Sequence, residues 1–463
     1  MNKPLSLLSS KWMVLLISSL GVFIMTVDNS MLFIAVPQIA TALKQDPALV
    51  TWVPTASLIG TTAFSIPFGR LSDVWGRKRL YLLGLVIVGV SGLLCGFAQN
   101  AYQLIGLRLL TGASSALIAA NAWALISEVF HSKERGKALG INTAVGFLGL
   151  SLGPVIGGLL ITQFGTWRVT FFSLVPFYLI LSALSYKWLP GATTSGQRRP
   201  SDLPGSLSFI CGLALLMLGL SFGRISGWTS FSTLTFFVSS IVVLSLFGYL
   251  ELRVAKDPML DLRTFSSNSQ FTLGNIATLF HYMSAHQGLT ILIAFYVQWA
   301  LNRSAAVAGI ITLAKFLTMA IFSPFSGWLS DRIGPRWLCA LGMTFVTASL
   351  VLLALMGPNA SLVNVFLRLS LLGVGIGLFA SPNINSVLSS LPQDKLGTAS
   401  GTLGTFRSLG GTIGLVLVGI ILAGGTAEAG FASQIGAGFI ALAVVAFLGV
   451  VASASRGKKE ANK

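Results

Sequence analysis

The chain has 463 residues, of which 54% are hydrophobic and only 9% are charged, whereas about 25% of the residues of a typical soluble protein are charged. So few charges exclude a soluble globular fold. Segments such as 80–98 and 337–356 hold no charged residue and are long enough to cross a bilayer as helices. No stretch alternates in polarity as the strands of a membrane barrel do. The sequence therefore predicts an all-α polytopic membrane protein.

The hydrophobic segments predict fourteen transmembrane helices. In chain order they cover residues 12–37, 48–68, 80–98, 102–127, 138–161, 169–188, 207–222, 231–250, 271–299, 308–330, 337–356, 362–388, 399–422 and 435–452. The connections are short, so no extramembrane domain is expected. The longest polar stretch, 189–205, is rich in Pro and Arg and indicates a linker.

The formal net charge of +17 would suggest a nucleic-acid partner in a soluble chain. Here the basic residues fall mostly between predicted spans, which favours a role in membrane orientation instead. With the N-terminus in the cytoplasm, 22 Lys and Arg residues lie inside and 4 lie outside. We therefore expect both termini in the cytoplasm and no nucleic-acid partner. The three cysteines lack the spacing of a disulfide framework or a metal site.

An internal repeat divides the chain. Residues 69–76, GRLSDVWG, have a counterpart in residues 327–334, GWLSDRIG, at an offset of 258. The first copy follows the second predicted span and the second copy follows the tenth. This spacing predicts two six-helix bundles, residues 1–188 and 266–463, with a linker and two inserted helices in residues 189–265. Repeated bundles around a midplane site are typical of secondary transporters.

Four segments resemble motifs of a known family. The loop 69–79 resembles the cytoplasmic signature loop of the major facilitator superfamily, and residues 146–158 resemble its antiporter motif. Residues 27–37 resemble the first-helix motif of the fourteen-helix drug:proton antiporter family, and residues 108–112 resemble its intramembrane arginine motif. The resemblance covers nearly the whole chain and implies a major facilitator fold.

The repeated loop is expected to act as a conformational latch, the role that the resemblance implies. Gly69 and Gly76 allow tight turns between helices. Asp73 lies among basic residues that include Arg77, with which it can pair, or it can face the N-terminal end of a helix. The alternative is a simple topology anchor.

The fifth span carries glycines at every fourth position, which places them on one helical face. Small residues on such a face let another helix approach closely, and a proline there can bend the span. The resemblance adds an association with exporters, whereas the alternative is ordinary close packing. The residues of this antiporter-motif helix are Gly149, Gly153, Pro154, Gly157 and Gly158.

Charged residues at membrane depth usually face a cavity and mark a functional site. Asp28 and Arg108 are the first candidates, for proton coupling and substrate binding, against the alternative of a fixed structural pair. The secondary candidates are Lys315, Arg368 and Arg407. Arg368 and Arg407 could equally tie helices together, and the role of Lys315 stays open.

Two histidines, His281 and His286, lie in the ninth predicted span. Histidine can relay protons near neutral pH. Five residues on one helix correspond to a rotation of about 140°, so the two rings are not expected to share a face. Packing by hydrogen bonds and a proton role both stay open for them.

The predicted function is proton-coupled export of small, largely apolar compounds by alternating access, which corresponds to multidrug efflux. No enzyme signature or phosphate-binding loop is found, so we expect no enzymatic activity, cofactor or metal. The expected setting is a multi-pass monomer in the inner or plasma membrane of the cell, with a small-molecule substrate, protons and the bilayer as partners. One deep carboxylate against four basic groups favours neutral, monocationic or anionic substrates. The alternatives are a dedicated exporter of one metabolite or lipid, and a receptor or scaffold that does not transport.

Overall fold

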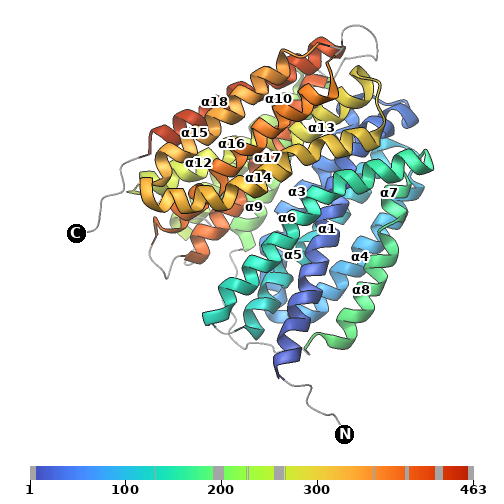
Figure 1. Cartoon of the computed structure of the whole chain (residues 1–463). Coiled ribbons are helices and arrows are strands. Elements are labelled where there is room, and N and C mark those ends of the chain that lie inside the picture. Colours follow the sequence, from blue (N-terminus) through green and yellow to red (C-terminus); the bar gives the residue numbers. More distant parts are fainter. Residues whose placement is uncertain are drawn as a thin grey trace. The chain divides into compact units, whose positions relative to one another are not determined.

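The computed structural model describes residues 7–130, 132–190, 203–225, 227, 229–254, 265, 267–357, 360–391, 396–422 and 431–456. Throughout these residues the regular secondary structure is helical, as Figure 1 shows. The chain forms two compact units. The first comprises Met1–Gln45 and Trp52–Leu203, and the second comprises Asp46–Thr51 and Pro204–Lys463.

The first unit is built from long helices that pack in pairs. Its helices are α1 (Leu7–Leu43), α3 (Trp52–Trp75), α4 (Arg77–Phe97), α5 (Ala101–Val129), α6 (Ser132–Phe164), α7 (Val169–Phe172) and α8 (Val175–Trp188). The closest pairings join α3 to α5, α1 to α6, and α4 to both α5 and α8. Helices α1 and α5 also touch, which brings the two candidate coupling residues onto neighbouring elements.

The second unit holds the remaining helices. They are α2 (Pro47–Val50), α9 (Leu203–Ile225), α10 (Phe231–Tyr249), the π-helical turn η1 (Leu250–Val254), α12 (Ser269–Ala285), α13 (Gln287–Phe295), the π-helical turn η2 (Tyr296–Ala300), α14 (Ala305–Ile333), α15 (Pro335–Ala354), α16 (Leu362–Leu388), α17 (Leu396–Leu422) and α18 (Phe431–Ala454). Helix α14 packs against α16, α15 against α16 and α18, and α12 against α17 and α18. The two inserted helices of the sequence analysis correspond to α9 and α10.

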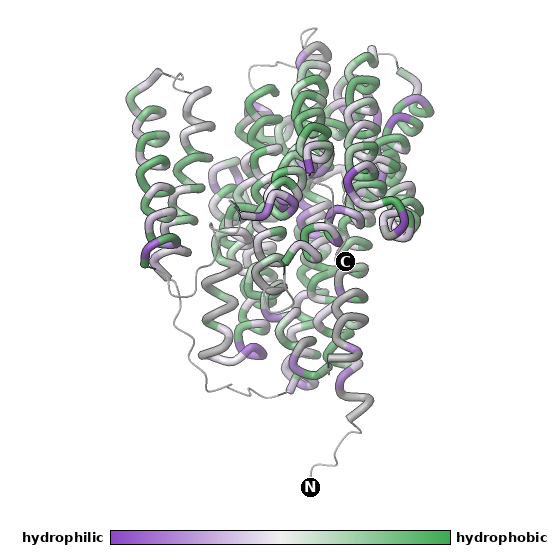
Figure 2. The backbone as a smooth tube through the Cα atoms, turned by 90° about the vertical axis from the view of Figure 1, so that its left-hand side faces the viewer, coloured by the Kyte–Doolittle hydropathy of each residue, from purple (hydrophilic) through white to green (hydrophobic). Residues whose placement is uncertain are grey.

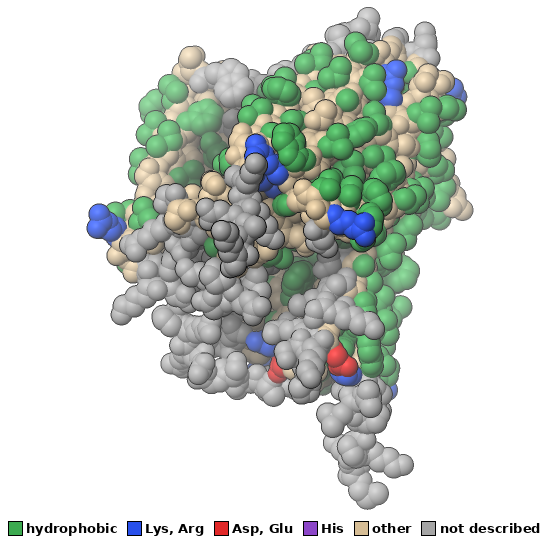
Figure 3. Space-filling view, turned by 60° about the vertical axis from the view of Figure 1, so that its left-hand side comes forward, with side chains coloured by type: hydrophobic (Ala, Val, Ile, Leu, Met, Phe, Trp, Pro, Cys, Tyr) green, Lys and Arg blue, Asp and Glu red, His purple; other side chains and the backbone are tan. Residues whose placement is uncertain are grey.

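Hydrophobic side chains lie on the outer surface of the helical units as well as in their interior. Figure 2 shows hydrophobic residues along most of the helical length, and Figure 3 shows them spread over the described surface of one face. On α10, for example, Phe231, Ile241 and Val242 are exposed. Apolar exposure on this scale is expected of a surface that faces lipid. In the described part of the chain, 11 helices are long and apolar enough to cross a membrane, so the total of fourteen spans stays a prediction.

Three predicted spans differ in detail from the helices observed. The second begins at Trp52, because the four residues before Thr51 form the separate helix α2. The sixth is interrupted after α7, where α8 begins with Pro176 in its first turn, a position that suits a residue without a backbone N–H. The ninth, predicted as one helix over 271–299, is broken at His286, whose φ and ψ of −114° and −107° are not helical. The break separates α12 from α13, and the turn η2 follows.

The two copies of the repeated loop end in the same backbone conformation. Gly76 has φ of 93° and precedes α4, and Gly334 has φ of 83° and precedes α15. Residues other than glycine rarely adopt such positive φ values. The repeat found in the sequence is therefore also a repeat of backbone geometry.

Candidate functional site

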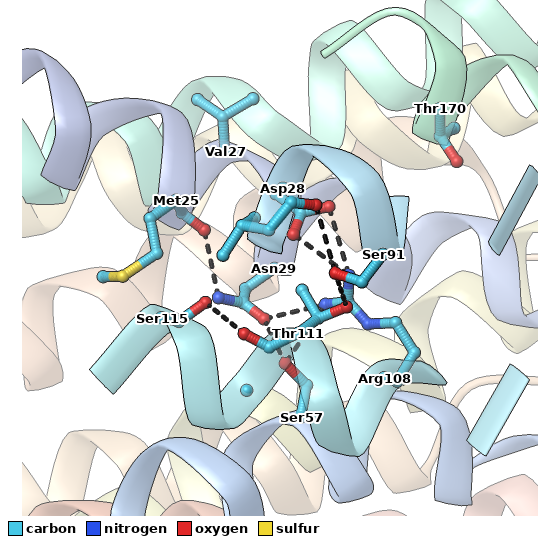
Figure 4. A network of polar contacts seen from close by, with 12 residues as sticks. Met25, Val27, Asp28, Asn29, Ser57, Ser91, Arg108, Thr111, Ser115 and Thr170 are labelled. Atoms are coloured by element: carbon cyan, nitrogen blue, oxygen red, sulfur yellow. Dashed lines mark hydrogen bonds and ion pairs between the residues drawn. The ribbon is translucent and has the colours of Figure 1, made fainter. Parts of the chain in front are cut away.

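The centre of the candidate site is an ion pair between α1 and α5 in the first unit (Figure 4). The Nη1 atom of Arg108 lies 3.2 Å from Oδ1 and 3.0 Å from Oδ2 of Asp28. The arginine side chain is 0% exposed and the aspartate side chain 7% exposed. A charged pair so far from solvent is retained when it has good geometry and further hydrogen bonds. The structure thus brings together the two residues that the sequence singled out.

Two polar neighbours complete the coordination of the guanidinium. Nη2 of Arg108 donates to Oδ1 of Asn29 at 2.9 Å and to Oγ of Ser57 at 3.3 Å. The Ser57 hydroxyl also donates to Oδ1 of Asn29 at 2.9 Å, while the Asn29 amide donates to the carbonyl of Met25 at 3.0 Å. Arg108 therefore links three helices, α1, α3 and α5. Its Nε atom is buried without a partner among the described residues.

Glycines explain how α3 and α5 come close enough to form this network. A Cβ atom added to Gly112 would lie 2.0 Å from the carbonyl oxygen of Ser57, and one added to Gly60 would lie 2.5 Å from the carbonyl oxygen of Leu109. No side chain fits at either position without moving a helix. Close contact at small residues is the usual way in which membrane helices associate.

A second group of hydroxyl contacts joins α4 to α5 near the ion pair. The hydroxyls of Ser91 and Thr111 lie 2.9 Å apart, and the hydroxyl of Ser115 donates to the Thr111 carbonyl at 2.8 Å. Thr111 belongs to the same motif as Arg108 and lies three residues further along α5. These hydroxyls tie α4 to α5 one turn from the arginine.

The glycine face of α6 lies directly on the stretch of α1 that carries Asp28. A Cβ atom on Gly149 would lie 2.1 Å from Oγ1 of Thr26, and one on Gly157 would lie 3.1 Å from Cα of Met31. Pro154 and Gly158 on α6 are buried as well. The glycine motif thus sets the distance between α6 and the helix of the candidate coupling residue.

The latch loop is described in part. Gly76 makes the turn, and Nη1 of Arg77 lies 3.2 Å from Oε2 of Glu128 and 3.3 Å from the carbonyl oxygen of Ala124. The contact ties the start of α4 to the end of α5. Gly69 lies within helix α3, which continues to Trp75, so the turn expected at both glycines occurs at Gly76 and the expectation for Gly69 is wrong. The side chain of Asp73 lies outside the described residues, so the latch role of Asp73 stays a prediction.

The two histidines of the second unit meet, contrary to the expectation from the sequence. Their Nε2 atoms lie 3.1 Å apart. The expectation assumed one continuous helix, but the chain breaks at His286, which turns the second ring back toward the first. The ring of His281 also stacks on Phe379, with centroids 4.3 Å apart, and its Nδ1 atom is buried without a partner among the described residues.

The basic secondary candidates separate into two places. The ammonium group of Lys315 donates to Oγ1 of Thr290 at 2.7 Å, and the guanidinium of Arg407 lies 5.2 Å from the ring centroid of Tyr282. Both lie near the histidine pair, because Tyr282 stacks on His286 and Thr290 bonds to its carbonyl. Arg368 does not join them and instead donates to the carbonyl of Leu352, which ties α16 to α15.

One buried cation was not singled out from the sequence. Arg456, which follows α18, is 1% exposed and donates to Oδ1 of Asn383 and to Sγ of Cys339. The Asn383 amide donates in turn to Oγ1 of Thr278 at 2.7 Å. From the sequence, Arg456 is only one of the basic residues expected on the cytoplasmic side, because nothing in its neighbours predicts burial.

Comparison with known proteins agrees with this architecture. The family model described as Major Facilitator Superfamily matches residues 18–266 and 271–463. The riboflavin transporter RibZ of Clostridioides difficile (strain 630) is 32% identical over 407 residues, which cover 88% of this chain and 87% of that protein. The multidrug resistance protein Stp of Mycobacterium tuberculosis (strain CDC 1551 / Oshkosh) is 30% identical over 411 residues, covering 88% and 75%. The crystal structure of a bacterial homolog of the human lysosomal transporter Spinster, inward-facing and unoccupied, has a TM-score of 0.70 at 15% identity and covers 98% of this chain and 97% of that chain. This last likeness concerns the fold alone.

Proposed function

The chain belongs to the Major Facilitator Superfamily and is a multi-pass membrane transporter, and from this premise we propose that it exports small, largely apolar compounds from the cell in exchange for protons. The similarity to a multidrug resistance protein supports a broad substrate range. A gradient can supply the energy, since moving one charge through 100 mV is worth about 2.3 kcal/mol.

The observation that carries the proposal is the buried pair of Asp28 and Arg108. As a carboxylate, Asp28 accepts two hydrogen bonds from the same guanidinium nitrogen. As a neutral acid it loses the charge–charge attraction to the arginine. A movement that draws α5 away from α1 therefore favours proton uptake, and one that restores the contact favours release.

Asn29 and Ser57 make such a cycle feasible. Both offer oxygen atoms to Nη2 of Arg108, so the guanidinium keeps polar partners while Asp28 is protonated. A buried charge left without any partner would be strongly destabilising. In this scheme Arg108 moves with α5 and keeps its contact with Ser57 of α3, which packs against α5, while Asp28 changes its protonation state.

The coupling would act through alternating access, in which one helical bundle rocks against the other. We propose that both termini are cytoplasmic and that residues 189–265, with α9 and α10, lie outside the pseudo-symmetric core. The repeated turns at Gly76 and Gly334 support a two-fold organisation of the chain.

A second candidate function is dedicated export of a single metabolite. The similarity to a riboflavin transporter favours it, because that relative has one named substrate. The two functions share the coupling site and differ in the breadth of substrates. Export assays with a panel of compounds in a drug-sensitive host, with and without a protonophore, separate them.

The test of proton coupling is Asp28→Asn, which keeps the size of the side chain but cannot titrate. We expect the variant to fold and reach the membrane, yet to lose protonophore-sensitive export and substrate-induced proton release. Asp46→Asn, at an exposed aspartate between α1 and α2, is the matched control and should export normally. Normal proton-driven export by Asp28→Asn would reject Asp28 as the coupling site.

A further inference from the structure

The break in the ninth predicted span gathers polar side chains within the second unit. His281 lies four residues before the end of α12, His286 lies at the break, and Thr290 lies one turn into α13. Thr290 accepts from Lys315 of α14 at 2.7 Å and donates to the His286 carbonyl at 2.8 Å. The lysine ammonium is thus linked to the histidine backbone through one hydroxyl.

Among the described residues, no carboxylate forms an ion pair with this lysine. The sequence contains no Asp or Glu between Asp261 and Asp331, and none between Asp331 and Asp394. Helices α12, α13 and α16 are therefore free of acidic residues. Lys315 is 3% exposed, and its hydrogen-bond partner in the described chain is a neutral hydroxyl. A buried cation is normally paired, and an intramembrane one marks a functional site whose partner should be sought.

A second cation reaches the same place from α17. The rings of Tyr282 and His286 are stacked, with centroids 4.1 Å apart and an angle of 7° between their planes. The guanidinium of Arg407 lies 5.2 Å from the Tyr282 ring, and its Nε atom is buried without a partner in the described residues. Helix α17 is held against the break one turn later, where a Cβ on Gly411 would lie 2.7 Å from Oε1 of Gln287.

The backbone adds further positive character. Helix α13 begins at Gln287, immediately after the break, and the first amide groups of a helix carry a partial positive charge. In transporters with discontinuous helices, such half-helix N-termini point at anionic groups of the substrate. Here the N-terminus of the half-helix α13 lies close to Lys315, Arg407 and the two histidine rings.

The surroundings favour an aromatic ligand. Phe379 stacks on His281, and the ring of Phe316 has its centroid 5.0 Å from the Lys315 ammonium. His286, Tyr282 and Arg407 are partly exposed, so the cluster is not closed on every side.

We propose that this cluster is a binding site for an organic anion, with Lys315 and Arg407 binding a carboxylate on an aromatic body. The inference that this ligand is a transported substrate rests on the proposed function, whereas the binding site itself does not. Lys315 supplies the buried charge, Arg407 supplies a planar donor, and the histidine pair holds the break in shape.

The test compares two dyes that share a xanthene ring system and differ in charge, the anionic carboxyfluorescein and the cationic tetramethylrhodamine methyl ester. Their binding to the purified full-length protein in detergent is measured by fluorescence polarisation. We expect carboxyfluorescein to bind more tightly, and Lys315→Gln and Arg407→Gln to raise its Kd about tenfold or more, as for the loss of a buried charge contact. Neither change should weaken the cationic dye. Lys315→Arg should retain most of the anion affinity. Arg303→Gln, which removes an exposed charge from the same unit, is the matched control and should bind like the native protein.

Two results would overturn the site. One is a native protein that binds the anionic dye no better than the cationic dye. The other is native affinity for the anion in folded Lys315→Gln and Arg407→Gln variants. If Lys315→Gln does not fold, a competition experiment on the native protein tests the site instead. Benzoate should displace carboxyfluorescein, whereas neutral benzamide at the same concentration should not. Equal displacement by both compounds would overturn the site. Since no gradient is present, this outcome is independent of the Asp28→Asn export assay, and either proposal can fail without the other.

Discussion

Gly153 of α6 lies so close to Ser30 of α1 that a Cβ atom on the glycine would be 1.8 Å from the serine hydroxyl oxygen and 2.9 Å from the carbonyl oxygen of Val27. Ser30 is two residues from Asp28, and its hydroxyl donates to the carbonyl of Gly149 at 3.2 Å. The motif associated with exporters and the candidate coupling residue are therefore parts of one helix–helix contact. A change in either helix must alter the other.

Gly153→Ala tests this contact. The added methyl group has no room, and overpacking of this kind typically destabilises a protein by about 1–3 kcal/mol. We expect a lower midpoint of thermal unfolding and a loss of export. Gly106→Ala on α5, where an added Cβ atom has no neighbour within 4 Å, should have the same midpoint of thermal unfolding as the native protein. Equal behaviour of the two variants would mean that α1 and α6 tolerate separation.

Arg108→Lys tests whether coordination or charge alone matters. A lysine keeps the positive charge but cannot serve Asp28, Asn29 and Ser57 together with the planar fork of an arginine. We expect the variant to be inserted in the membrane and to export at least about tenfold more slowly, in keeping with a change of 1.4 kcal/mol or more. Transport in everted vesicles at equal protein content measures it, and a rate within twofold of the native rate would contradict it.

Arg77→Gln tests the latch through the part of it that is described. The change removes the contact with Glu128 and should bias a conformational equilibrium without touching substrate. We expect a slower maximal transport rate with nearly unchanged substrate affinity, and the same pattern for Asp73→Asn. Lys187→Gln, at an exposed basic residue of α8 outside the loop, serves as the control. A large loss of affinity with an intact rate would show that the loop acts at the substrate site.

The topology is tested by reporters. The excess of basic residues in alternate loops predicts that a reporter fused after Lys463 reads as cytoplasmic. A reporter inserted at 301–304, between η2 and α14, should read as external. An external signal from the C-terminal fusion would reverse the assignment of inside and outside.

The sequence predicted the superfamily and the central ion pair, for an identifiable reason. Four motifs occurred in order, and the match over residues 18–266 and 271–463 confirms the superfamily. Asp28 and Arg108 stood out because charges within apolar stretches are rare. The antiporter subfamily with fourteen helices stays a prediction.

Other parts of the site were out of reach of the sequence because they depend on packing. Nothing in the sequence distinguishes Ser57 from other serines in membrane spans. Its role depends on the close contact at Gly112, which places α3 against α5. The meeting of His281 and His286 was missed because a helical period holds only while the backbone is helical. The contribution of Asn29 could have been predicted, because it adjoins Asp28 in the first-helix motif, residues 27–37.

The burial of Arg456 sets a boundary for work with shortened forms of the protein. Its guanidinium is the donor that satisfies the side chain of Asn383 and lies against the Cys339 thiol, although it follows the last residue of α18, Ala454. A version trimmed at the end of that helix would lose this donor from its interior. Any tag, cleavage site or fusion joint at this end should therefore be placed so that Arg456 is retained.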